Sequence, residues 1–305
     1  MMEYILEAKN ISKAYNGVQA LENVSISLEK GKIYGLIGQN GAGKTTLMRI
    51  IAGLSFPTSG ELYLFNQPDQ KSLQAGRRRM GSMIENPSIL GNMSAITNLR
   101  VHKTMKGIKE ESVEQQALNI VGLGHTGKKK AKDFSLGMRQ RLGIAITLLG
   151  NPEILMLDEP INGLDPSGIA EIRQLIKELA AKYQMTILLS SHHLAELHQT
   201  ADEFIIVNRG KILKNLSHDQ LENQIDKHLI LDCNEPEKLQ KVLREVLDTE
   251  NFIVQPDKSI KLYDFMDNKE ELSKALIDHS IIVTTLATQE ETLESYYLQL
   301  IGGAG

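Results

Sequence analysis

The chain has 305 residues, with 34 basic and 38 acidic side chains, a formal net charge of −4 and 41% hydrophobic residues. This length suggests about two domains of roughly 100–200 residues each, and the composition suits ordinary globular cores. The acidic balance excludes a basic field over the whole molecule and argues against a dedicated nucleic-acid binder. No apolar run reaches the roughly 18 residues that mark a membrane-spanning helix.

The chain has one cysteine, Cys233, so neither an internal disulfide nor a cysteine-based zinc site is expected. Glu3, Glu7 and Lys9 interrupt the apolar pattern at the start of the sequence, which does not fit a signal peptide. Both features fit a cytosolic compartment.

The first 210 or so residues alternate short β-like runs with helical runs, as in an α/β domain. The predicted strands cover residues 4–8, 24–28, 32–37, 62–65, 80–84, 154–157, 186–189 and 204–207. Between about residues 88 and 150 the pattern is helical, and we interpret this stretch as a helical subdomain inserted in the α/β core. Asp165 followed by Pro166 predicts a further helix start, with an N-cap and a proline in the first turn.

The composition changes after about residue 217, where glycine disappears until Gly302 and charged residues dominate. The pattern predicts strand, helix, strand, strand, helix, strand and helix at residues 229–233, 236–247, 252–254, 260–263, 269–278, 281–285 and 293–300. This order is typical of a small α+β domain of the β-α-β-β-α-β type. We therefore expect two domains, residues 1–217 and 218–305.

A glycine-rich segment fits the phosphate-loop pattern G-x-x-x-x-G-K-[ST] in full. Its residues are Gly38, Gln39, Asn40, Gly41, Ala42, Gly43, Lys44, Thr45 and Thr46. The glycines let backbone N–H groups approach phosphates, and the helix that follows directs its positive end at them. Lys44 is expected to reach the terminal phosphates of ATP, and the Thr45 hydroxyl to bind Mg²⁺.

Two carboxylates, Asp158 and Glu159, end the apolar run 154–157. Ligands of open α/β sheets bind beyond the carboxyl ends of the strands. We expect Asp158 to hold Mg²⁺ through its water shell, and Glu159 to orient or deprotonate the attacking water. The segment 190–193 follows another strand, so a histidine there can face the γ-phosphate, and Ser191 is predicted to cap a helix over 192–199.

With these motifs in order, residues 3–217 resemble the ATP-binding subunit of ABC transporters. The distinguishing segment is 134–141, Phe-Ser-Leu-Gly-Met-Arg-Gln-Arg, which is similar to the family signature L-S-G-G-Q followed by x-Q-R. Only Ser135 and Gly137 match within the first five positions. Ser135 is also a good N-cap for a helix over 136–149, whose N-terminus can bind a phosphate. The resemblance implies an α/β P-loop NTPase core of the ABC ATPase type.

In that family the signature contacts ATP held by the other subunit, so the resemblance implies a head-to-tail homodimer or heterodimer of ATP-binding subunits. Tyr15 matches the aromatic residue that stacks on adenine, and residues 162–165 match a loop between the subunits. His192 aligns with the switch histidine, because Leu194 and Glu196 then fall where the family has them.

One position departs from the family pattern. Glu85 stands where the family usually has a glutamine that contacts Mg²⁺ and the transport partner, and we expect this carboxylate to bind the metal as well. Residues 84–87, the segment 134–138 and the C-terminal extension resemble the bacterial subgroup that exports, or confers immunity to, peptide antibiotics such as bacitracin and lantibiotics.

The resulting hypothesis is an ATPase, with Lys44, Glu159 and His192 as its catalytic residues, that powers export of peptide antibiotics or drugs through a separate polytopic membrane permease. The protein would be peripheral on the inner, cytoplasmic face of the cell membrane, without direct nucleic-acid contact. One alternative is a soluble ABC-type ATPase that acts on ribosomes or DNA, and another is a nucleotide-controlled binding protein with little turnover. The C-terminal domain shows no catalytic constellation and is interpreted as a regulatory or dimer-stabilising module.

Overall fold

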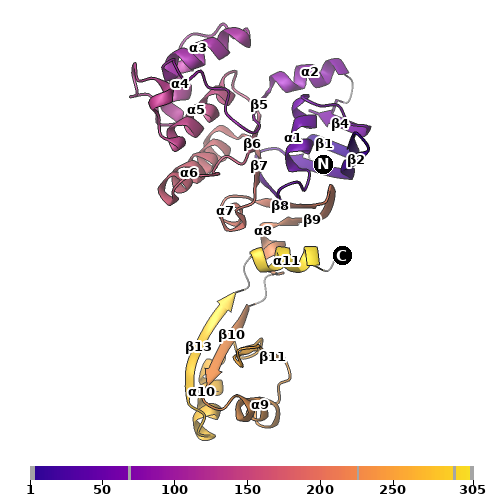
Figure 1. The fold of residues 1–305 in the computed structure, drawn as a ribbon, viewed down its shortest axis with the longest axis vertical. Helices are drawn as coiled ribbons and strands as arrows, with labels where there is room; N and C mark the ends of the chain where they lie inside the picture. The colour runs from indigo at the N-terminus through magenta and orange to yellow at the C-terminus, as the bar shows by residue number, and fades with distance from the viewer. Residues whose placement is uncertain (1–3, 68–69, 225–226, 291–292, 303–305) are drawn as a thin grey trace. The chain divides into compact units, whose positions relative to one another are not determined.

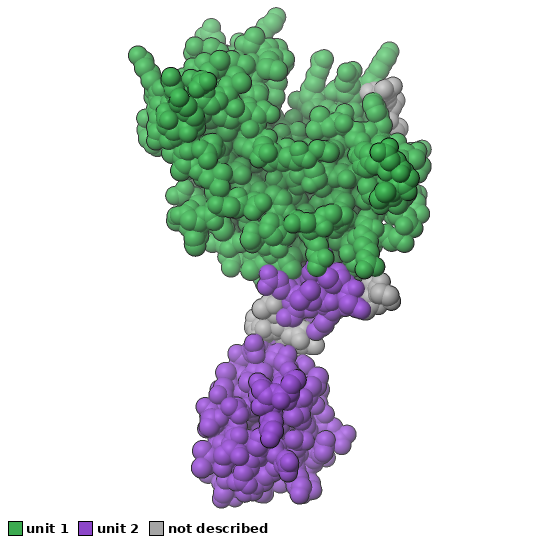
Figure 2. Space-filling view, in the orientation of Figure 1, with its two compact units in different colours: residues 1–218 green, residues 219–305 purple. Residues whose placement is uncertain are grey.

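The computed structural model describes residues 4–67, 70–224, 227–290 and 293–302. Residue contacts divide the chain into two compact units, Met1–His218 and Asp219–Gly305 (Figures 1 and 2).

The first unit is organised around a six-stranded sheet with the strand order β5-β6-β7-β3-β8-β9. In that order the strands are β5 (Met80–Met83), β6 (Ile154–Asp158), β7 (Thr186–Ser191), β3 (Ile33–Ile37), β8 (Glu203–Asn208) and β9 (Lys211–Ser217). Neighbours from β5 to β8 pair in parallel, and β9 joins β8 antiparallel. Every residue of β3, β6 and β7 is buried, as expected for central parallel strands covered on both faces.

Three helices follow the three central strands along the chain. They are α1 (Lys44–Ala52), α6 (Pro166–Tyr183) and α7 (Leu194–His198). α6 begins as the sequence predicts, because the Asp165 side chain accepts a hydrogen bond from the Gly168 N–H at 3.2 Å and Pro166 occupies the first turn. Hydrogen bonds from the Ser167 hydroxyl and the Gly168 N–H lower the pKa of Asp165.

A second, antiparallel sheet has the order β2-β1-β4 and packs into the same core as the first. Its strands are β1 (Tyr4–Tyr15), β2 (Val18–Glu29) and β4 (Ser59–Leu64), followed by α2 (Gln70–Arg78). The two N-terminal strands extend further than their sequence predicts, and they stay paired through polar residues with several register shifts. The sequence pattern does not predict α2 or β9.

The helical subdomain contains α3 (Ala95–Met105), α4 (Val113–Ile120) and α5 (Leu136–Leu148), with a short 3-10 turn η1 (Ala131–Asp133). Figure 1 shows these helices gathered beside the β5 edge of the six-stranded sheet. Gly143 allows α5 to approach that edge closely, because a Cβ atom there would lie 2.5 Å from Pro87 Cβ and 2.6 Å from Met83 Sδ. Such a contact is shorter than real Cβ contacts, so Gly143 sets the packing of the subdomain against β5.

The second unit contains a four-stranded antiparallel sheet with the order β11-β12-β10-β13. Its elements are β10 (Lys227–Cys233), α9 (Pro236–Glu245), β11 (Phe252–Val254), β12 (Ile260–Leu262), α10 (Lys269–Asp278) and β13 (Val283–Glu290), with α11 (Leu293–Gly302) after them and α8 (His218–Glu222) at the junction. Leu229, Leu243, Leu262 and Leu272 form part of its core. The chain order β-α-β-β-α-β confirms the predicted small α+β domain.

None of the helices within the described residues is both long enough and apolar enough to cross a membrane.

We predict that Gly143→Ala destabilises the protein by about 1–3 kcal/mol, because the added methyl group overpacks the contact of α5 with Pro87 and Met83. The clash opposes the gain of about 1 kcal/mol in helix propensity that alanine usually brings. Urea unfolding followed by circular dichroism measures the change. Gly302→Ala is the matched control, because a Cβ atom there has no heavy atom within 4 Å. Equal stability of the two variants would contradict the packing role of Gly143.

Candidate nucleotide-binding site

The glycine-rich loop connects β3 to α1. Its backbone lies so close to β2 and β8 that two of its positions have no room for a side chain. A Cβ atom on Gly43, whose φ is 108°, would lie 2.8 Å from the Ala20 carbonyl oxygen, and one on Gly38 would lie 2.6 Å from that of Val207. Gly43 is the N-cap of α1 and provides no side-chain hydrogen bond to the first turn. Because no side chain caps that turn, its N–H groups and the positive end of the helix are available to an anion.

Lys44 is the buried cation of the site, with only 6% of its surface exposed. Its Nζ donates a hydrogen bond to the Gly38 carbonyl oxygen at 2.6 Å and lies 3.4 Å from Glu159 Oε1. A buried ammonium group needs such partners, because removing it from water is costly. These contacts hold the positive charge of Lys44 beside the loop where phosphates would bind.

Asp158, at the end of β6, is 3% exposed and accepts two hydrogen bonds from hydroxyl groups. The Thr45 hydroxyl donates to Oδ2 at 2.9 Å, and the Ser190 hydroxyl donates to Oδ1 at 2.5 Å. The three oxygen-bearing side chains come from α1, β6 and β7. Carboxylate and hydroxyl oxygens are the ligands that Mg²⁺ prefers, so the residues present fit that ion.

Glu159 lies one residue further, with a positive φ of 49°, which turns its side chain out of the strand direction. Its backbone N–H donates to Ser190 Oγ at 3.0 Å, and its Oε2 lies 2.8 Å from Nδ1 of His192. The carboxylate therefore lies between the Lys44 ammonium and the His192 imidazole. A carboxylate held in this way can accept a proton from a water molecule beside the phosphates.

Ser190 contributes to the site although its sequence position alone does not predict this role. The prediction that Ser191 caps a helix over 192–199 is wrong, because α7 begins at Leu194 and its N-cap, His193, makes no side-chain capping bond. Ser191 is the last residue of β7, and its hydroxyl accepts a hydrogen bond from the His193 N–H at 2.9 Å. The Ser190 hydroxyl links the Asp158 carboxylate to the backbone N–H of Glu159. The sequence feature that points to Ser190 is a hydroxyl residue directly after the apolar run 186–189.

The signature segment lies against another loop of the same chain. Ser135 is the N-cap of α5, as predicted, and its hydroxyl accepts a hydrogen bond from the Met138 N–H at 3.2 Å. A Cβ atom on Gly137 would lie 3.8 Å from the Leu164 side chain, and one on Gly163 would lie 3.2 Å from that of Leu136. The start of α5 and the loop 162–165 therefore form one surface.

Tyr15 ends β1 and is 43% exposed. Its hydroxyl is hydrogen-bonded to the Ser55 hydroxyl at 3.2 Å, and Lys13 Nζ lies 4.7 Å from the centre of its ring. An exposed ring fixed at its hydroxyl end can stack on a flat ligand.

Glu85 does not join the Asp158 group among the described residues. Its carboxylate accepts a hydrogen bond from Arg49 Nη2 at 2.5 Å, and its backbone has a positive φ of 64°. The expectation that Glu85 binds metal therefore stays a prediction.

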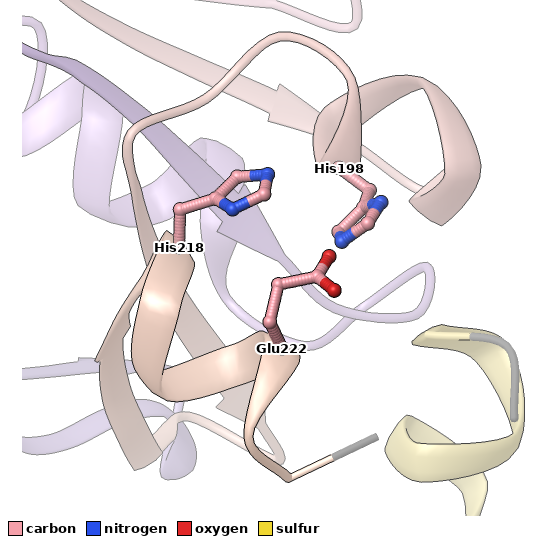
Figure 3. Close-up of side chains that lie close together, drawn as sticks. All are labelled: His198, His218 and Glu222. Atoms are coloured by element: carbon pink, nitrogen blue, oxygen red, sulfur yellow. The ribbon is translucent and has the colours of Figure 1, made fainter. Parts of the chain in front are cut away.

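Figure 3 shows His198, His218 and Glu222, whose ligand-type atoms all lie within 4.8 Å of one another. The rings of His198 and His218 stack, with their centres 5.0 Å apart. None of these three residues belongs to the sequence motifs of the nucleotide site.

The glycine-rich loop between a parallel strand and a helix, with carboxylates at the end of a nearby strand, defines a P-loop nucleoside triphosphatase. The core strands β6, β7 and β3 are adjacent, which brings Asp158, His192 and the loop to one edge of the sheet. This arrangement is suited to binding a triphosphate and placing a water molecule beside it.

Comparison with known proteins defines the class more closely. Residues 21–162 match the family model described as ABC transporter. The bacitracin transport ATP-binding protein of Enterococcus faecalis is 37% identical over 100% of this chain and 99% of that protein. A lantibiotic transport ATP-binding protein of Streptococcus pyogenes is 43% identical over 72% of this chain and 93% of that protein. A solved dimer of an ATP-binding cassette with ADP and phosphate, in a post-hydrolysis state, is 25% identical, with a TM-score of 0.63 over 70% of this chain and 98% of the other.

The chain belongs to the family of ABC transporter ATP-binding proteins, and it binds and hydrolyses ATP as a subunit of such a transporter. The predicted family and fold class are confirmed. The solved cassette with which the chain shares 25% identity is a dimer.

We predict that Ser190→Ala lowers the free energy of unfolding by about 1–3 kcal/mol, because the buried carboxylate of Asp158 loses a hydrogen-bond donor. Chemical denaturation measures this loss. Ser191→Ala is the matched control, since its equally buried hydroxyl is hydrogen-bonded, among the described residues, to the backbone N–H of His193 and not to a carboxylate. A loss for Ser190→Ala no larger than that for Ser191→Ala would contradict the link to Asp158.

Proposed function

We propose that this ATPase powers the export of peptide antibiotics through a separate polytopic permease, from the inner, cytoplasmic face of the cell membrane. The observation that carries the proposal is the likeness to a bacitracin transport ATP-binding protein over the whole chain. The lantibiotic relative matches over only 219 residues, about the length of the first unit. The likeness over both units therefore favours the bacitracin type of substrate.

The proposed phosphate site consists of the loop residues 38–46, with Lys44 as the cation that neutralises the terminal phosphates. Lys44 Nζ now binds the Gly38 carbonyl oxygen and can exchange this neutral partner for a charged phosphate. Thr45 and Asp158 would hold Mg²⁺, which supplies positive charge to the phosphate oxygens when bound.

Glu159 is proposed as the residue that orients the attacking water and accepts its proton. His192 is proposed to hold Glu159 in place through the 2.8 Å contact and to contact the γ-phosphate. Catalysis then depends on positioning and charge, because the protein forms no covalent bond to the nucleotide in this scheme.

Ser135 and Gly137 are proposed to bind ATP held by a second ATP-binding subunit, either an identical chain or a different one. The Ser135 hydroxyl and the first N–H groups of the 13-residue helix α5 form an anion-binding end. Tyr15 is proposed to stack on the adenine of the ATP bound by its own chain. The dimeric state of the solved cassette that resembles this chain supports the pairing.

The alternative of a soluble ATPase acting on ribosomes or DNA has no support in these observations. The whole-chain relative is a transport protein. The family match covers one cassette, residues 21–162.

We predict that Glu159→Gln keeps ATP binding but lowers turnover by about 10²–10⁴-fold, because the amide cannot accept the proton of the attacking water. Nucleotide binding and phosphate release measured on the same sample separate the two effects. Lys44→Ala serves as the contrasting variant and should lose ATP binding itself. Turnover by Glu159→Gln at the wild-type rate would contradict the role of Glu159.

The partner is tested by pull-down of the Glu159→Gln variant from membranes of the native cell, with and without ATP. We expect one polytopic membrane protein in near-equal amount, and deletion of its gene should raise sensitivity to bacitracin-like peptides. Recovery of ribosomal or DNA-repair proteins without such a membrane protein would contradict the transport proposal while leaving the ATPase assignment intact.

A further inference from the structure

The Arg49–Glu85 ion pair links a residue of the phosphate-loop helix to the segment after β5. Arg49 Nη2 lies 2.5 Å from Glu85 Oε1, and the two side chains are 42% and 54% exposed. Glu85 reaches this partner from a left-handed backbone conformation, which is uncommon outside glycine and asparagine. The pair is thus a specific arrangement of two exposed charges.

The two members of the pair come from chain segments next to those that carry the oxygen group of Asp158. In the parallel pairing of β5 with β6, Met83 lies opposite Leu157. Glu85 and Glu159 each stand two residues after this pair, so they occupy corresponding positions beyond the two strands. Arg49 lies one helical turn after Thr45, on the same face of α1. Thr45 in turn donates its hydrogen bond to Asp158. Both members of the ion pair therefore come from positions adjacent to the proposed metal ligands.

A carboxylate at this position has two competing interactions when ATP binds. It is repelled by the phosphates, and it is attracted by a divalent cation next to them. Arg49 neutralises the Glu85 carboxylate and holds it by its guanidinium group. Because both side chains are exposed, this hold is weak enough for a divalent cation to compete with it.

We propose that Arg49 is a positioning residue that competes with the divalent cation for the Glu85 carboxylate and so sets the Mg²⁺ concentration at which ATP binds. This inference rests on the metal site proposed above and on the sequence-based expectation that Glu85 is a further ligand of that metal. It assigns Arg49 a function that the phosphate-loop motif itself does not require, because the motif ends at Thr45.

The test is a Mg²⁺ titration of the binding of a fluorescent ATP analogue by the full chain. Arg49→Met keeps the aliphatic stem of Arg49 and removes its charge. We expect the half-saturating Mg²⁺ concentration to fall about two- to fivefold, the range of a weak exposed ion pair. In a Glu85→Gln background the same Arg49→Met substitution should cause no such fall, because no carboxylate remains to be released.

A second readout separates competition from a structural role. Without Mg²⁺, Arg49→Met should weaken binding of the analogue, because the Glu85 carboxylate then faces the phosphates without neutralisation. Arg100→Met, on the exposed surface of α3, is the control for the loss of one positive charge and should change neither readout.

An equal shift of the Mg²⁺ midpoint in both backgrounds, or no shift in either, would overturn the proposal. Such a result leaves the proposed function standing if the variants still hydrolyse ATP. Failure of the wild-type chain to bind the analogue at any Mg²⁺ concentration would instead contradict the nucleotide site itself.

Discussion

The position of the Asp158 carboxylate is the constraint on which the rest of the site depends. Two hydroxyl groups hold it, one from the first turn of α1 and one from the end of β7. Since Ser190 also accepts the backbone N–H of Glu159, the same contacts fix the carboxylate that we propose as the base. Buried charges need partners, so the phosphate loop, β6 and β7 are tied to a single geometry. The parallel order β6-β7-β3 makes this possible because it places the three strand ends side by side.

The residues proposed to bind ATP lie in two separate parts of the first unit. The phosphate loop, Lys44 and Glu159 gather at one edge of the sheet, whereas Ser135 stands at the start of α5 and packs with the loop that contains Gly163. Hydrogen bonds of the Ser135 hydroxyl remain within its own helix turn. A second subunit that presents its own α5 would supply the anion-binding end that we propose for the γ-phosphate. In this account ATP binding and subunit pairing are one event, which a membrane partner can detect as motion.

The sequence predicted those parts that depend on local pattern. The apolar runs gave β3 and β6, the glycine spacing gave the loop, and the Ser135 and Asp165 caps begin α5 and α6 as expected. The sequence does not predict contacts that depend on how distant segments of the chain pack together. The Ser190 contact depends on the register of β7 with β6, and the Arg49–Glu85 pair depends on where α1 meets the end of β5. The predicted start of α7 is wrong because β7 continues through Ser191. The buried position of Ser191 in the strand overrides its preference for capping a helix.

The most direct test of the central claim is the mass of the Glu159→Gln variant in solution, measured by multi-angle light scattering with ATP and Mg²⁺. The chain has a mass of 34.0 kDa. The account predicts about twice this mass when ATP is present, and a return to the single-chain mass when Lys44→Ala is added. A single-chain mass at saturating ATP would contradict the head-to-tail homodimer. The same result after mixing with a second ATP-binding subunit from the native cell would contradict the heterodimer as well.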